Sequence, residues 1–168
     1  MNASELPFAA AGRSSARESL KSRSIRFLLN RLPAYRRAGG TIVFISDDLS
    51  RARVRVRHGW RTYGQKGATF GGSLYAAIDP CYVIMLQWRL GKSYAVWDRH
   101  AAIDFSRQAR TSLYADIHCS DAELSAIRAE ADAAGRTERV FRIELADRDG
   151  IVHMTCDKTV VVKRRTAS

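Results

Sequence analysis

The chain has 168 residues, of which 46% are hydrophobic and 27% are charged, and its formal net charge is +11. This composition is ordinary for a soluble globular protein and gives no sign of disorder beyond the ends, and the length suits one domain, which buries roughly two-thirds of its unfolded surface. We expect a single domain over residues 25–165, preceded by a flexible basic lead over residues 1–24.

The first predicted element is a helix that begins at Ser24. Apolar residues recur from Ile25 to Leu32 at the spacing i, i+3, i+4, i+7, which places them on one helix face. Pro33 and the pair Gly39-Gly40 are expected to end this helix, because proline and glycine both disfavour helical continuation.

Two strands follow, over residues 41–46 and 51–58. The second strand alternates arginine with apolar residues, so that all of its arginines point to one face of the sheet. These are Arg51, Arg53, Arg55 and Arg57. The row is either a solvated outer face or a stripe that binds phosphate groups, and Arg55 and Arg57 are the substrate-binding candidates.

A long, mostly apolar helix is predicted over residues 70–91. It starts at Gly71-Gly72 and contains one carboxylate, Asp79, followed by Pro80, which is expected to kink it. An ionised carboxyl in apolar surroundings is costly unless it is paired or functional. A helix that begins at glycines presents free main-chain N–H groups to an approaching ligand. Together these features suggest acyl chemistry.

The rest of the chain reads as four strands and one helix. Ser120 and Glu123 form a capping box at the start of the helix, and Gly135 closes it. The strands are predicted over residues 94–105, 111–119, 138–146 and 151–162. The expected fold class is therefore α+β, with six antiparallel strands wrapped around the long helix.

Charge and cysteine content narrow the function classes. The positive charge lies mainly in residues 1–66 and could attract nucleic acid, an anionic membrane or a phosphate-bearing molecule such as coenzyme A. No nucleic-acid motif is recognisable and no membrane span is expected, so a nucleic-acid or membrane-surface binder ranks third among the functions, supported only by this charge. Three widely spaced cysteines and four histidines without ligand spacing predict a reduced cytoplasmic protein with no metal or cofactor.

At residues 70–79 the sequence resembles the hot-dog-fold acyl-CoA thioesterase superfamily, in particular an uncharacterised subgroup near the phenylacetyl-CoA thioesterases. Those proteins start the central helix with His-Gly-Gly and carry an Asp nine residues after the His. Here the three positions are Phe70, Gly71 and Gly72, and Asp79 stands at the expected distance. The resemblance covers about residues 25–165, and Phe70 replaces the family His.

The resemblance implies a thioesterase in which the N–H of Gly71 or Gly72 polarises the thioester carbonyl. Asp79 would attack directly or activate a water. Eight residues of helix separate Gly71 from Asp79 by roughly 12 Å, at about 1.5 Å per residue. One chain therefore cannot bring both groups to one carbonyl. Two antiparallel helices can, which predicts a homodimer with shared sites that could pair further into a tetramer.

Other residues near this helix are candidates for substrate binding. They are Phe70, Gln65, Ser73, Tyr75, Tyr82 and Trp97. Aromatic residues on a buried helix are more often plain core. Asp98 is either a second carboxylate near the site or an ion-pair partner of Arg99 or Arg107. The alternative function is a non-catalytic protein that binds acyl-CoA or an acyl carrier, which Phe70 in place of His favours.

Overall fold

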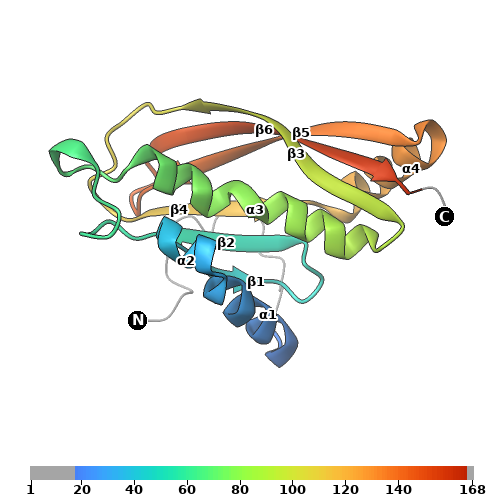
Figure 1. Cartoon of the computed structure of the whole chain (residues 1–168), viewed down its shortest axis with the longest axis horizontal. Helices are drawn as coiled ribbons and strands as arrows, with labels where there is room; N and C mark the ends of the chain where they lie inside the picture. Colours follow the sequence, from blue (N-terminus) through green and yellow to red (C-terminus); the bar gives the residue numbers. More distant parts are fainter. Residues whose placement is uncertain (1–17, 166–168) are drawn as a thin grey trace.

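The computed structural model describes residues 18–165, which form one six-stranded antiparallel sheet and four α-helices (Figure 1). The strands are β1 (Gly40–Ile45), β2 (Arg51–Val56), β3 (Tyr94–Asp104), β4 (Leu113–His118), β5 (Arg136–Ala146) and β6 (Val152–Arg164). The helices are α1 (Leu20–Arg31), α2 (Pro33–Ala38), α3 (Gly71–Leu90) and α4 (Asp121–Ala134), with a short 3₁₀ helix, η2 (Gln65–Gly67).

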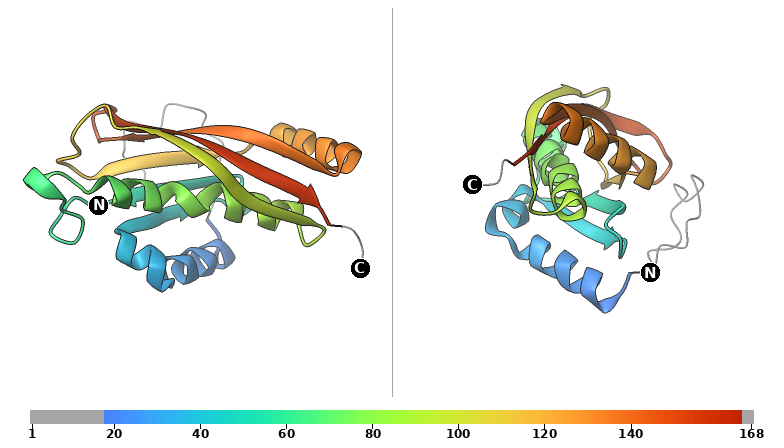
Figure 2. Two further views of the ribbon diagram at one scale, coloured as in Figure 1. Left: turned by 45° about the horizontal axis from the view of Figure 1, so that its top comes forward. Right: turned by 90° about the vertical axis from the view of Figure 1, so that its right-hand side faces the viewer.

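The sheet has the strand order β1-β2-β4-β5-β6-β3 and curves around α3 (Figure 2, right). This is the hot-dog layout that the resemblance predicts. α3 buries one side against the sheet through Leu74, Ala77, Ile78, Cys81, Tyr82, Met85, Leu86 and Leu90. Its other side is only partly covered, and it carries Tyr75, Ala76, Asp79, Pro80 and Val83. Among the described residues, no helix is long and apolar enough to cross a membrane.

The N-terminal helical segment differs from the prediction in two ways. α1 begins at Leu20 rather than at Ser24, because the Ser19 hydroxyl accepts a hydrogen bond from the Ser22 N–H at 3.3 Å and caps the helix earlier. Pro33 does interrupt α1, but it also starts α2. Proline suits the first helical position, where no N–H is required, and it forces extended geometry on the preceding residue. Residues 1–17 of the expected lead lie outside the described residues.

The later elements follow the predictions closely. Ser120 Oγ accepts from the Glu123 N–H at 3.1 Å, which confirms the cap of α4, and Gly135 ends that helix with φ 74°. β2 ends at Val56, two residues before the predicted end of the strand, so Arg57 lies in the loop that follows. Ile127 and Ala131 of α4 are buried in the core.

Gly40 joins the N-terminal helices to β1 at a point where the main chain crosses α3. A Cβ atom on Gly40 would lie 2.7 Å from the Ala77 Cβ and 2.8 Å from the Ala77 Cα, and the second is main chain that cannot rotate away. We expect Gly40→Ala to lower the free energy of unfolding by about 1–3 kcal/mol, as overpacked core positions do. Urea denaturation measures this effect.

Gly59→Ala is the matched control for that substitution, because a Cβ at Gly59 meets no described atom within 4 Å. We expect its free energy of unfolding to stay within about 0.5 kcal/mol of the wild type. Equal effects of the two substitutions would contradict the close contact between Gly40 and α3.

Candidate active site

Asp79 lies in the middle of α3, on the side that the sheet leaves open. Its side chain is 42% exposed, although the helix around it is apolar. Pro80 follows inside the helix, which continues to Leu90. The carboxylate can therefore reach a molecule bound against this side of α3.

Lys158 of β6 is the partner of Asp79. Its side chain is fully buried, and its Nζ donates to Asp79 Oδ1 at 2.8 Å and to Asp98 Oδ2 at 2.9 Å. The same ammonium also donates to the main-chain carbonyl of Asp79. Three acceptors thus surround one buried cation, which compensates much of the cost of removing the charge from water.

Lys158 was missed by the sequence analysis, although the strand carries a signal for it. In β6 the residues Met154, Cys156, Lys158, Val160 and Val162 alternate along the strand and are all buried. A lysine in such a row occupies a core position, and a buried lysine is almost always paired. The expected partner is a carboxylate, and α3 contains only one.

Asp98 of β3 is the second carboxylate of this cluster. Burial raises the pKa of Asp98 above its ordinary value; the Lys158 ammonium opposes the rise and the neighbouring Asp79 adds to it. Asp98 Oδ1 is buried without a hydrogen-bond partner among the described residues. Asp98 therefore lies near Asp79, as one of the two predicted alternatives has it, and shares the Lys158 ammonium with it. The expected arginine partners are wrong, because Arg99 pairs with Glu138 and Asp98 pairs with Lys158.

Tyr75 joins the cluster from one turn earlier in α3. Burial and a hydrogen bond with Asp79 raise the pKa of the Tyr75 hydroxyl, so it remains a neutral donor. Lys158 Nζ lies 5.6 Å from the centre of the Tyr75 ring, within cation–π range. We call Asp79, Asp98, Lys158 and Tyr75 the Asp79 cluster.

The remaining aromatic candidates have different surroundings. Tyr82 belongs to the core, where its ring stacks on Phe141 at 3.9 Å between centroids and its hydroxyl donates to the His118 carbonyl. Trp97 lies on the edge strand β3 and is 39% exposed. Of the two, Trp97 is the one open to a ligand in this chain.

The start of α3 forms a separate feature. Gly71 is its first residue, and the N–H groups of Gly71 and Gly72 have no acceptor among the described residues, as is usual for a first helical turn. The Ser73 N–H is not free for a ligand, because it donates to the Phe70 carbonyl at 2.9 Å. The Phe70 ring lies beside Gly72 and is 61% exposed, and the Phe105 ring lies beside Gly71. Gln65 belongs to η2, in the loop before this helix.

A groove of about 260 Å³ lies beside Asp79, between α3 and the segment that includes α1, α2 and β1. Its lining is apolar except for the Asp79 carboxylate and the Tyr35 hydroxyl. The lining residues are Leu29, Leu32, Tyr35, Ala38, Ile42, Ala76, Asp79, Pro80 and Ile84. The Tyr35 hydroxyl already donates to the Ala77 carbonyl at 2.8 Å. The groove therefore offers an apolar molecule a surface that includes one carboxylate.

The predicted row of arginines, three on β2 and Arg57 just after it, does not have uniform surroundings. Arg53 is paired with Asp116 of β4, which faces it across the two strands, at 2.8 Å. Arg55 and Arg57 line a second pocket together with residues of α2 and β1. The solvated-face interpretation therefore fits Arg53, whereas Arg55 and Arg57 line a cavity.

Comparison with known proteins agrees with this fold. The family model for a domain of unknown function, DUF4442, matches residues 21–162. The chain belongs to the DUF4442 family. No curated protein matches this DUF4442 chain.

Solved structures similar to this DUF4442 domain share its fold at low sequence identity. A protein of unknown function from Pseudomonas aeruginosa, PA5026, described as a probable thioesterase, has a TM-score of 0.76 at 16% identity, over 86% of this chain and 96% of that one. OLEI01261 from Chlorobaculum tepidum, of unknown function, has a TM-score of 0.70 at 12% identity, covering 90% and 99%. The thioesterase HI1161 from Haemophilus influenzae has a TM-score of 0.62 at 14% identity, covering 84% and 90%.

Proposed function

We propose that this protein is a thioesterase that hydrolyses an acyl-CoA or acyl-carrier thioester with water, giving a carboxylic acid and a thiol. The observation that carries the proposal is the Asp79 carboxylate, which is half-exposed and lines an apolar groove. The groove takes the acyl group. Asp79 then attacks the thioester carbon or removes a proton from the attacking water.

Lys158 orients the catalytic carboxylate. It donates to Asp79 Oδ1 and to the Asp79 carbonyl, so both the side chain and its helix position are fixed relative to β6. A carboxylate held in one rotamer does not have to be ordered during the reaction, which lowers the entropic part of the activation free energy. Tyr75 adds a second donor from the same helix.

A homodimer completes the site in this proposal. Asp79 and the free N–H groups of Gly71 and Gly72 are eight or fewer residues apart in one helix, at separations of up to roughly 12 Å. The partly covered side of α3 carries Tyr75, Ala76, Asp79, Pro80 and Val83, a stripe that a second α3 can cover. An antiparallel neighbour would bring its helix start to Asp79, so that each site uses both chains.

The test is a panel of acyl-CoAs of different chain length and aromaticity, assayed for release of free thiol. We expect turnover with at least one substrate and a loss of 10²–10⁴-fold in kcat in Asp79→Asn, the range for removal of a general base or nucleophile. The variant should fold, because Lys158 keeps Asp98 and the Asp79 carbonyl as acceptors. Full activity of Asp79→Asn would refute the assignment.

A second function, binding an acyl thioester without hydrolysis, is favoured by Phe70. The family His at the helix start is absent, and the exposed phenyl ring beside Gly72 cannot transfer a proton. In that case acyl-CoA binds tightly to the wild type, and no member of the panel releases thiol. The same assay therefore separates the two functions.

A further inference from the structure

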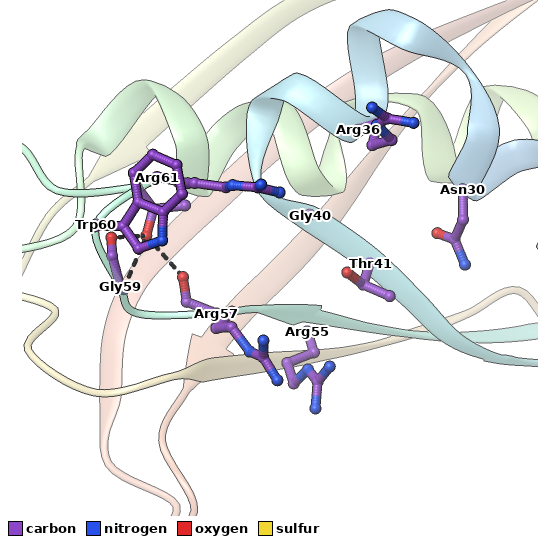
Figure 3. A pocket seen from close by; sticks show the side chains of 11 residues that line it. Asn30, Arg36, Gly40, Thr41, Arg55, Arg57, Gly59, Trp60 and Arg61 are labelled. Carbon is purple, nitrogen blue, oxygen red and sulfur yellow. Dashed lines mark hydrogen bonds between the residues drawn. The ribbon is translucent and has the colours of Figure 1, made fainter.

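A second pocket, of about 550 Å³, is lined by four arginines and an exposed tryptophan (Figure 3). We call it the arginine pocket. Its lining residues are Asn30, Arg36, Gly39, Gly40, Thr41, Arg55, Arg57, Gly59, Trp60, Arg61 and Thr62. Its volume lies within the range of small-molecule sites. No aspartate or glutamate is among these residues.

The arginines come from three segments that converge on one space. Arg36 belongs to α2, Arg55 to β2, and Arg57 and Arg61 to the loop after β2. Figure 3 shows the Arg55 and Arg57 side chains next to each other, with Trp60 and Arg61 at one end of the pocket and Asn30 at the other. The Asn30 amide is already hydrogen-bonded, because it donates to the Ile42 carbonyl and accepts from the Ile42 N–H.

Within the described part of the chain, these arginines lack the carboxylate partners that other arginines have. Arg53 faces Asp116 across the strands, whereas Arg55 faces Thr41 on one side and Tyr114 on the other. Arg36, Arg55 and Arg57 form no ion pair with any residue between 18 and 165. Arg55 Nε is buried and has no acceptor within the described residues. Guanidinium groups that converge without counter-charge bind phosphate, which accepts two N–H groups of one arginine at once.

Trp60 supplies a second kind of contact. Its side chain is 78% exposed, and the Arg61 guanidinium carbon lies 4.9 Å from the ring centroid. An exposed indole beside clustered arginines is a stacking surface for a planar base, and the arginine face adds a cation–π contact. Phosphate contacts and a base platform in one pocket match a nucleoside phosphate.

The loop that carries Trp60 is fixed in place, so the pocket is preformed. Thr62 Oγ1 donates to the Arg57 carbonyl at 2.7 Å and accepts from the Gly59 N–H at 3.2 Å. The Thr62 carbonyl accepts from the Phe70 N–H at 2.7 Å, which ties the loop to the start of α3. The arginine pocket is thereby joined directly to the helix that carries Asp79.

We propose that the arginine pocket binds a nucleoside phosphate, with Arg55 and Arg57 on the phosphate and Trp60 on the base. Two sources share this chemistry: a free nucleotide, and the 3′-phosphorylated ADP portion of coenzyme A. Only the second source rests on the proposed thioesterase function.

The direct test is calorimetry with adenosine 3′,5′-bisphosphate, adenosine and pyrophosphate on the wild type. We expect the bisphosphate to bind, adenosine to bind at least tenfold more weakly, and the combined Arg55→Gln and Arg57→Gln variant to lose at least tenfold in affinity. Trp60→Ala should weaken the bisphosphate but leave pyrophosphate unchanged. Arg53→Gln is the matched control on the same strand, and it should bind as the wild type does.

Three results overturn the proposal. One is no binding of the bisphosphate at millimolar concentration. Another is an equal loss in Arg53→Gln, which would show a nonspecific charge effect. The third is a single-stranded oligonucleotide that binds more tightly than the bisphosphate and is lost in the same variants, which would assign the surface to nucleic acid.

Substrates with and without the nucleotide identify the source. If the pocket binds the nucleotide of coenzyme A, KM for an acyl-CoA should be at least tenfold lower than KM for the same acyl group on pantetheine. The combined Arg55→Gln and Arg57→Gln variant should remove that difference in KM with kcat unchanged. Equal KM values with intact bisphosphate binding assign the pocket to a free nucleotide. Bisphosphate binding without any thiol release supports nucleotide binding by the arginine pocket and refutes the proposed thioesterase activity. Thiol release without bisphosphate binding supports the thioesterase activity and refutes nucleotide binding by the pocket.

Discussion

Replacing Lys158 by methionine is expected to lower the free energy of unfolding by about 3 kcal/mol. Methionine keeps most of the side-chain volume but removes the ammonium that Asp79 and Asp98 share. Breaking a buried ion pair from one side typically costs 3–5 kcal/mol, and the partly exposed carboxylates place this case at the lower end. Urea denaturation at pH 7 measures the loss.

Lys163→Met is the control for Lys158, since it removes a lysine from an exposed position of the same strand. We expect its effect to stay within about 0.5 kcal/mol. Equal stability of the two variants would show that the buried ion pair contributes nothing.

Asp98→Asn is the companion variant, and its effect should depend on pH. Because burial raises the pKa of Asp98, its contribution to stability is present below the ordinary carboxyl pKa and is lost as pH rises through the raised value. Asparagine is neutral at every pH, so the variant does not lose stability through ionisation at this position. In urea denaturation, the variant should therefore lose less stability than the wild type as pH rises from 3 to 7.

Mixing two inactive variants is expected to restore part of the activity. Asp79→Asn lacks the carboxylate, and Gly71→Pro lacks one N–H group at the helix start. Proline is tolerated there, because Gly71 is the first helical residue and Phe70 already has the extended geometry that precedes proline, φ −60° and ψ 128°. Each variant alone should lose about 10²-fold or more in kcat.

If the sites are shared between chains, the mixed dimer contains one intact site made of Asp79 from one chain and Gly71 from the other. With equal co-expression about half of the dimers are mixed, and each mixed dimer has one intact site of two. About a quarter of the wild-type activity should therefore return. Gly71→Ala adds a similar Cβ beside Phe105 but keeps the N–H, and it should remain active. The absence of any recovery would contradict shared sites, and so would hydrolysis by a monomer.

The sequence predicted the elements of the fold because its periodicities are local. The alternation in residues 51–56, the apolar stretch after Gly72 and the cap at Ser120 each depend on neighbours within a few positions, and all three are present in the structure. The early start of α1 was missed because it depends on one Ser19 hydroxyl bond rather than on apolar spacing.

The site was only partly predictable for the opposite reason. Asp79 stood out within its own helix, but its partner Lys158 is 79 residues away, and only the packing of the sheet onto α3 brings them together. The arginine row was visible, yet only the position of Asp116 shows that Arg53 is paired. Contacts between distant segments decide which charged residues are free to bind a ligand.

The ammonium of Lys158 makes the site depend on β6, the last described strand. Both of its carboxylate partners precede it by at least 60 residues. Without Lys158, Asp79 and Asp98 are two like charges close together, and like charges oppose closure of the sheet over that part of α3. The completed site therefore depends on the C-terminal strand, and a chain that stops short of β6 lacks the cation that holds the carboxylate in place.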